Sequence, residues 1–171
     1  MSSSLQFRLA VESDAAPLLD FMQSYYAFDG HAYDREKARV ALTELLRDPN
    51  LGAAWLILND DKPVGYIVLC FGYSLEWLGR DAFVDEFYLG EEYRRRGWGQ
   101  AAIAFLEDAA RERGVRVLHL EVMEGNQTAL HFYQKLGFRE HRSTLHSKWI
   151  ARDLSKPQLQ NRNHSDSRDH R

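Results

Sequence analysis

Hydrophobic and polar residues follow two different periods along the chain, and each period predicts one kind of element. Apolar residues three and four positions apart indicate helices over residues 15–29, 34–48, 98–114 and 126–137. Runs rich in β-branched and aromatic residues indicate strands at residues 6–10, 53–59, 64–73, 82–90, 115–122 and 146–154. The predicted order is β-α-α-β-β-β-α-β-α-β-β, which is typical of a single mixed-sheet α+β domain.

The last part of the chain has a different pattern. Residues 155–171 read SKPQLQNRNHSDSRDHR, in which Leu159 is the only sizeable apolar side chain. Such a segment buries too little apolar surface to offset the entropy of ordering it, so we expect a disordered tail. The folded domain is therefore predicted to span residues 5–154.

Composition narrows the class of protein. The chain has 171 residues and a net charge of −3, which disfavours a general nucleic-acid binder because such proteins are usually strongly basic. Its one cysteine, Cys70, excludes an internal disulfide, and the histidines form no spaced metal set. No apolar run is long enough for a membrane span, and the N-terminus lacks the pattern of a secretory signal. We expect a cytoplasmic protein that binds no metal.

One short stretch, RRRGWGQ at Arg94–Gln100, gathers three cations beside two glycines. It follows a predicted strand and opens a predicted helix, whose first amide groups lack intrahelical partners and carry the positive end of the helix dipole. Glycine has no Cβ to block an approaching anion, and arginine adds charge-assisted hydrogen bonds. The sequence favours a phosphate-binding loop here, with a basic surface turn as the alternative.

Two blocks of the sequence together resemble the GNAT acetyltransferase superfamily. The block YLGEEYRRRGWGQAAIAFLEDA is similar to its acetyl-CoA loop, with the R/Q-x-x-G-x-G/A pattern at Arg94, Gly97 and Gly99. A second block, LEVMEGNQTALHFYQKLGF, resembles the strand and helix that follow, with Asn126 and Tyr133 at matching positions. The resemblance covers roughly residues 5–154 and implies acetyl-CoA as the co-substrate.

The resemblance also implies which residues would meet acetyl-CoA. Backbone groups of Phe87, Tyr88 and Leu89 would face the pantetheine arm. The pyrophosphate would be held by the amides of Arg95, Arg96, Gly97, Trp98, Gly99 and Gln100. Arg94 would add a side-chain contact, and Asn126 would reach the pantetheine or the adenosine side. A plain helix N-cap is the alternative role of Asn126.

The resemblance further implies the catalytic groups. Tyr133 matches the tyrosine that protonates the departing CoA thiolate, whereas a core tyrosine is its ordinary alternative. The amine must lose a proton, and Glu86 is the first candidate base, with Asp85 and Glu121 as substitutes. Because Asp85 and Glu86 are adjacent on a strand, we expect their side chains to point to opposite faces, so that only one can face the acceptor.

The acceptor itself is less defined by the sequence. Aromatic and acidic residues gather in and near the loop between the first two helices, and these would line the acceptor side: Tyr25, Tyr26, Phe28, Asp29, Tyr33 and Asp34, with Tyr73 opposite. Such residues suit a cationic primary amine such as a polyamine. Acetylation of protein lysines or N-termini, a non-catalytic acyl-CoA sensor, and a homodimer remain open alternatives.

Overall fold

The structure is a computed structural model that describes residues 4–141, 143–148 and 150. The chain divides into two compact units, residues 1–139 and 140–171. All helices and strands found in the described residues lie in the first unit. In the described part of the second unit, the His141 ring Nδ1 lies 2.8 Å from the Ser143 hydroxyl.

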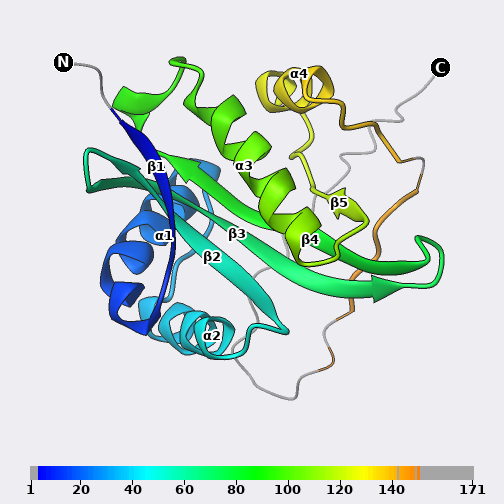
Figure 1. Ribbon diagram of the computed structural model, residues 1–171, viewed down its shortest axis with the longest axis horizontal. Coiled ribbons are helices and arrows are strands. Elements are labelled where there is room, and N and C mark those ends of the chain that lie inside the picture. Colours follow the sequence, from blue (N-terminus) through cyan, green and yellow to red (C-terminus); the bar gives the residue numbers. More distant parts are fainter. Residues whose placement is uncertain (1–3, 142, 149, 151–171) are drawn as a thin grey trace, which may run out of the picture. The chain divides into compact units, whose positions relative to one another are not determined.

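A five-stranded sheet forms the centre of the first unit, with the strands in the order β1-β2-β3-β4-β5 (Figure 1). Its strands are β1 (Leu5–Leu9), β2 (Gly52–Asn59), β3 (Lys62–Ser74), β4 (Gly79–Leu89) and β5 (Val117–His119). The first four pair antiparallel, and β4 pairs with β5 in parallel over Asp81–Phe83 only. From Val84 to Leu89, the second edge of β4 therefore has no partner strand among the described residues.

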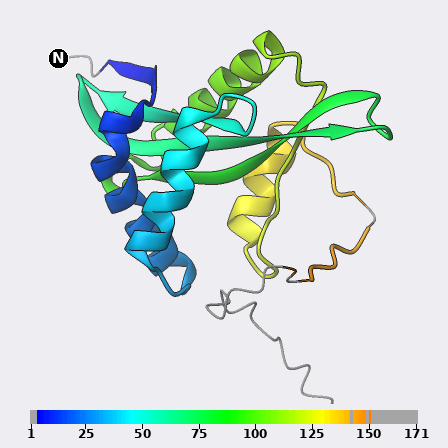
Figure 2. The same ribbon diagram turned by 90° about the horizontal axis from the view of Figure 1, so that it is seen from below.

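Helices cover both faces of the sheet. Helices α1 (Ala15–Asp29) and α2 (Arg35–Arg47) lie on one face of the sheet, and α3 (Trp98–Glu112) lies on the other, as both Figure 1 and Figure 2 show. On the α1–α2 face, Leu18 and Leu42 pack against Leu56 and Val68. On the α3 face the core holds Trp55, Ile67, Leu69, Val84, Ile103 and Leu106, and Phe132 and Tyr133 of α4 (Gln127–Lys135) pack against it. Because successive side chains of a strand point to opposite faces of the sheet, each strand contributes residues to two separate cores.

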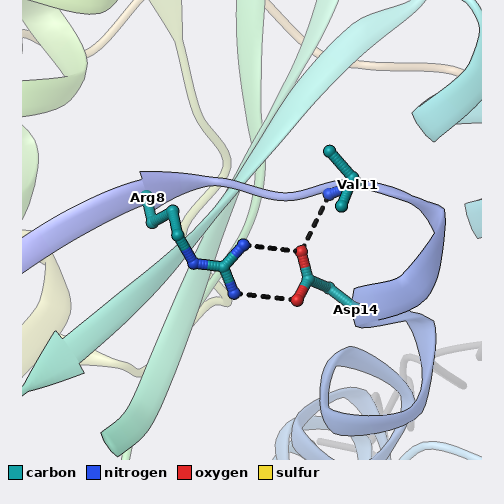
Figure 3. A network of polar contacts seen from close by, with 3 residues as sticks. All are labelled: Arg8, Val11 and Asp14. Carbon is teal, nitrogen blue, oxygen red and sulfur yellow. Dashed lines mark hydrogen bonds and ion pairs between the residues drawn. The ribbon is translucent and has the colours of Figure 1, made fainter. Parts of the chain in front are cut away.

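A bidentate ion pair joins the end of β1 to the start of α1 (Figure 3). The Arg8 guanidinium donates to both carboxylate oxygens of Asp14 at 2.8 and 2.9 Å, and the Val11 amide donates to the same carboxylate at 2.9 Å. Asp14 stands at the N-cap of α1, but its side chain makes no capping bond there. Its carboxylate fixes the entry of the chain into α1.

The predicted fold class and the element order up to α4 are confirmed. Strand β5 is shorter than the predicted residues 115–122, since only Val117–His119 pair with β4. The predicted last strand is not found where the structure describes it, because residues 146–148 and 150 belong to no strand. The rest of that strand and the tail at 155–171 lie outside the described residues.

Candidate active site

The arginine loop presents a row of free backbone amides. Within the described part of the chain, none of the amide N–H groups of residues 95–100 has a hydrogen-bond acceptor, and the first amide of α3 with a partner is Ala101, which donates to the Gly97 carbonyl at 3.1 Å. The backbone takes the left-handed conformation at Arg95 (φ 60°) and at Gly97 (φ 81°). Left-handed residues in a turn direct successive N–H groups to one side, which creates a concave anion site.

The two glycines of the loop have different surroundings. A Cβ on Gly97 would meet no atom within 4 Å, so this residue lies open beside the free amides. A Cβ on Gly99 would approach the Phe132 ring of α4 to 3.3 Å. Gly97 is therefore required for its backbone conformation, and Gly99 for the close approach of α3 to α4.

The three arginines do not act alike. The Arg94 Nε donates to the Leu89 carbonyl at 2.8 Å, and its guanidinium lies over the rings of Phe28 and Tyr88, with the guanidinium carbon 4.9 and 5.4 Å from the ring centroids. The Arg96 guanidinium lies 5.8 Å from the Tyr93 ring centroid. Arg94 is therefore anchored within the fold, whereas Arg95 and Arg96 are exposed beside the free amides.

Beside this loop runs the unpaired edge of β4. Phe87 packs toward the α3 core, Tyr88 lies on the α1–α2 face near Phe21, and Leu89 is buried. The Leu89 carbonyl already accepts from Arg94. An unpaired strand edge offers backbone donors and acceptors to an extended ligand, so this edge can bind one as a further strand would.

A β-bulge lies in β4 at the candidate bases. Val68 of β3 pairs with Glu86 and the next residue, Leu69, pairs with Val84, so Asp85 is an extra residue in β4. Val84 consequently packs in the α3 core, whereas Glu86 meets Tyr66 on the α1–α2 face. The expectation that Asp85 and Glu86 point to opposite faces is wrong, because the bulge breaks the alternation and brings both carboxyls near Cys70 and Tyr26.

Glu86 is a buried acid held by hydroxyl groups. Its side chain is 8% exposed, and its Oε2 accepts a 2.6 Å hydrogen bond from the Tyr66 hydroxyl. Burial raises the pKa of the Glu86 carboxyl above its ordinary value, and the charge of Asp85 adds to this, while hydrogen bonds from Tyr66 and Tyr26 oppose it. A raised pKa makes this carboxylate a better proton acceptor at neutral pH than an exposed one.

Tyr133 lies on α4, on the other side of the sheet from Glu86. Its ring packs edge-on against Phe132 and Phe138, with centroids 5.0 and 5.6 Å apart. Burial raises the pKa of Tyr133 to about 12, so the phenol is protonated at neutral pH. No hydrogen-bond partner for its hydroxyl is found among the described residues. The open edge of β4 separates this potential proton donor from Glu86, the potential acceptor.

The remaining predicted site residues are placed as follows. Asn126 caps α4, since its Oδ1 accepts from the Ala129 amide at 3.0 Å, and Asp34 caps α2 by accepting from the Lys37 amide. Glu121 is exposed beyond the end of β5 and does not contribute to the pKa shift of Glu86. Tyr73 is 76% exposed near the end of β3.

Aromatic residues of α1 and the loop after it gather on the Glu86 side. The Tyr26 ring lies 5.8 Å from that of Tyr25 and 5.5 Å from that of Tyr33, centroid to centroid. The Tyr33 hydroxyl donates to the Leu19 carbonyl at 2.9 Å, and Phe28, near the end of α1 at Asp29, is 64% exposed. Three of the predicted acceptor residues thus form one aromatic group, while Asp34 serves as a cap and Tyr73 lies apart.

Sequence reasoning missed Tyr66 and the neighbourhood of Cys70. Both lie in the apolar run VGYIVLCFGY, two residues to either side of Val68, and so share its face of the sheet. The contact of Tyr66 with Glu86 depends on the register of β3 with β4, which the sequence does not display. Burial raises the pKa of the Cys70 thiol to about 12, so it is no nucleophile at neutral pH.

The described residues contain no group of three or more histidine, cysteine, aspartate or glutamate side chains placed to hold a metal ion. None of the helices found there has the length and apolar character that crossing a membrane requires.

The fold and this site together are typical of an acyltransferase, and comparison with known proteins supports this class. The model of the acetyltransferase (GNAT) family matches residues 18–138, and the chain belongs to this family. An N-acetyltransferase of Bacillus subtilis (strain 168), YycN, is 44% identical over 85 residues, which are 50% of this chain and 53% of that protein. The thialysine N-epsilon-acetyltransferase of Bos taurus is 34% identical over 77 residues, 45% of either chain.

A solved structure extends the likeness over the whole fold. The integron cassette protein HFX_CASS3 from the mobile metagenome of Cole Harbour Salt Marsh has 33% sequence identity and a TM-score of 0.76, covering 87% of this chain and 93% of that one. By contrast, the chain spans about half the length of the Bacillus subtilis and Bos taurus relatives.

Proposed function

We propose that this chain transfers an acetyl group from acetyl-CoA directly to a primary amine. The observation that carries the proposal is the row of amides at residues 95–100, which have no acceptor within the described part of the chain. They stand at the N-terminus of α3, where the helix dipole favours an anion, and Gly97 leaves the approach open. A pyrophosphate fits such a site.

The proposed chemistry uses one proton acceptor and one proton donor. The amine nitrogen attacks the thioester carbonyl carbon, and Glu86 takes a proton from that nitrogen. The carbon–sulfur bond then breaks, and the Tyr133 hydroxyl gives its proton to the departing thiolate. Asp85 is the nearest substitute base, because the bulge puts it on the same face as Glu86.

A small cationic amine is the proposed acceptor class. Tyr25, Tyr26 and Tyr33 gather beside two carboxyl groups, Asp85 and Glu86, whose charges act on the Tyr26 hydroxyl. Aromatic faces and carboxylates both attract an ammonium group, and a neutral amine forms when a carboxylate removes its proton. The Bos taurus relative is an acetyltransferase for thialysine, itself a small amine, which supports this class.

The experiment that tests the proposal measures CoA release and binding separately. We expect thiol release from acetyl-CoA with members of a panel of polyamines, amino acids, lysine peptides and N-terminal peptides. We also expect acetyl-CoA to stabilise the fold by about 2.7 kcal/mol at a hundred times its dissociation constant. Stabilisation without turnover for any amine would favour the sensor alternative, and no stabilisation at all would contradict acetyl-CoA binding.

A further inference from the structure

Glu86 is the only charged side chain found buried among the described residues, and the buried Tyr66 hydroxyl is bonded to it. The Tyr66 hydroxyl donates to Oε2 of Glu86 across 2.6 Å, a short distance typical of a hydroxyl bound to an ionised carboxylate. Tyr66 is itself only 1% exposed. The pair is therefore shielded from water, which makes the bond stronger than it would be at the surface.

The fold holds Tyr66 in a fixed place. Its backbone pairs with Tyr88 in the middle of the sheet, and its ring stacks against Phe21 of α1 with centroids 6.2 Å apart. Glu86 reaches the hydroxyl only because the bulge at Asp85 turns its side chain toward the α1–α2 face. The hydrogen bond therefore depends on two separate features: the packing of Tyr66 in β3 and the bulge at Asp85 in β4.

We propose that Tyr66 is a positioning residue, whose buried hydroxyl holds one carboxylate oxygen of Glu86 and so fixes the direction in which the carboxylate meets the acceptor amine. The inference rests on the proposed function, in which Glu86 is the base. A carboxyl group rotates about its last bond unless one oxygen is engaged, and a base must lie within hydrogen-bond reach of the proton it takes. Tyr66 does not itself touch the reacting atoms.

The hydroxyl also sets the ionisation of Glu86. Burial and the charge of Asp85 both favour the neutral acid, whereas the hydrogen bonds from Tyr66 and Tyr26 favour the carboxylate. Other titratable or charged groups on this face include Tyr25 and Tyr33 from the α1 side, Cys70 of β3, Tyr88 of β4 and Arg94, which lies over the Tyr88 ring. Removing the Tyr66 hydroxyl leaves the opposing influences in place, so the pKa of Glu86 must rise further.

The test compares the wild-type protein with Tyr66→Phe, which keeps the ring and its stacking on Phe21. Two titrations are recorded: that of the Glu86 carboxyl in the free protein, by carbon-13 NMR, and the pH dependence of kcat/KM for acetyl transfer. We expect both midpoints to move to higher pH. At a pH below the wild-type midpoint kcat/KM should fall roughly tenfold, as expected for loss of one hydrogen bond to a charged group. The deficit should shrink at high pH, and the affinity for acetyl-CoA should not change.

Two further proteins test whether the hydroxyl of Tyr66 acts through Glu86. Replacing Tyr66 by 3-fluorotyrosine makes the hydroxyl a stronger donor, so both midpoints should move to lower pH. In a Glu86→Gln background, Tyr66→Phe should have no further effect on kcat/KM, because the hydroxyl acts through the carboxyl group.

The outcomes separate the inference from the proposed function. Wild-type midpoints in both titrations of Tyr66→Phe would overturn the positioning role. A shifted carboxyl titration with an unchanged pH–rate profile would overturn the role of Glu86 as the base, and the positioning role with it. A protein that binds acetyl-CoA and acetylates no amine would contradict the proposed function and the catalytic purpose of Tyr66 with it, whereas the carboxyl titration would still show whether Tyr66 holds Glu86.

Discussion

The guanidinium carbon of Arg94 lies 4.9 Å from the centroid of the Phe28 ring. Arg94 is the first residue of the amide loop, and Phe28 is the penultimate residue of α1. The Arg94 Nε also donates to the Leu89 carbonyl at the end of β4. One side chain thus links the proposed pyrophosphate loop to the proposed acceptor side.

Arg94→Ala is expected to weaken this connection. The loss of one hydrogen bond and two partly exposed cation–π contacts should lower the free energy of unfolding by roughly 2–3 kcal/mol. The KM for the amine should rise more than the dissociation constant of acetyl-CoA, because the substitution removes the interaction with Phe28 of α1. Urea unfolding and steady-state kinetics measure the two effects. Arg95→Ala is the matched control, because no such contact of Arg95 is found in the part of the chain that the structure describes, and an equal loss of stability there would contradict the anchoring role.

Gly97→Ala is expected to weaken acetyl-CoA binding through both its Cβ and its backbone. At a φ of 81° a residue with a Cβ is strained by about 1–2 kcal/mol, and the new methyl group would stand beside the free amides. We expect at least a tenfold loss of affinity in isothermal calorimetry, with the variant still folded.

Gly114→Ala is the control for that strain. Gly114 has a φ of 75°, and a Cβ there would also meet nothing within 4 Å, but it lies at the far end of α3 from the loop. The two variants should therefore lose similar stability, while only Gly97→Ala loses affinity. Equal affinities in both would show that the loop does not contact the pyrophosphate.

Local patterns were enough to predict the helices, the first five strands and the loop before α3, although β5 is shorter than predicted and the strand expected at residues 146–154 is not found where the structure describes it. The cap of α2 at Asp34 and the glycine spacing of the loop are decided by neighbours within a few residues, so the sequence displays them. The same holds for Asn126, whose capping bond is to an amide three residues later. Such capping bonds can be predicted from a sequence, because the capping side chain and the amide that donates to it lie only three residues apart.

The arrangement around Glu86 could not be predicted in this way. The bulge at Asp85 depends on how β4 registers against β3, and the hydrogen bond from Tyr66 joins residues twenty positions apart. A one-residue bulge reverses which face every following side chain occupies. Strict alternation therefore gave the wrong face for one of the two acids, and it hid Tyr66 in what reads as a plain apolar strand.

Glu86→Gln is expected to stabilise the fold as the pH rises. Because burial raises the pKa of Glu86 in the folded state, the folded protein binds this proton more tightly than the unfolded chain does. The stability that Glu86 contributes is thus fully present below the unfolded pKa of about 4.3 and is lost as the pH rises through the folded pKa. Glutamine stays neutral and carries no such loss.

Urea unfolding at several values between about pH 4 and pH 8 measures this difference. The variant and the wild type should have similar stability at the acidic end, and the variant should become the more stable one toward neutral pH. The opposite trend would mean that the hydrogen bonds from Tyr66 and Tyr26 outweigh the burial of the carboxylate.

Tyr133→Phe is expected to abolish most of the turnover and to leave the fold intact. The change removes only the hydroxyl, which has no partner among the described residues, and keeps the ring against Phe132 and Phe138. The free energy of unfolding should therefore stay about the same, since the change breaks no hydrogen bond found among the described residues. Turnover should fall by roughly 10²–10⁴, the usual effect of losing a positioned proton donor.

The acyl donor provides the control for this last variant. A thioester whose leaving thiolate is less basic than that of CoA needs less help from a proton donor, so the deficit of Tyr133→Phe should shrink with it. Single-turnover kinetics with both donors, alongside calorimetry of acetyl-CoA binding, separate chemistry from affinity. A variant that releases CoA at the wild-type rate while chemistry limits turnover would make Tyr133 a core residue, held on α4 only for its ring.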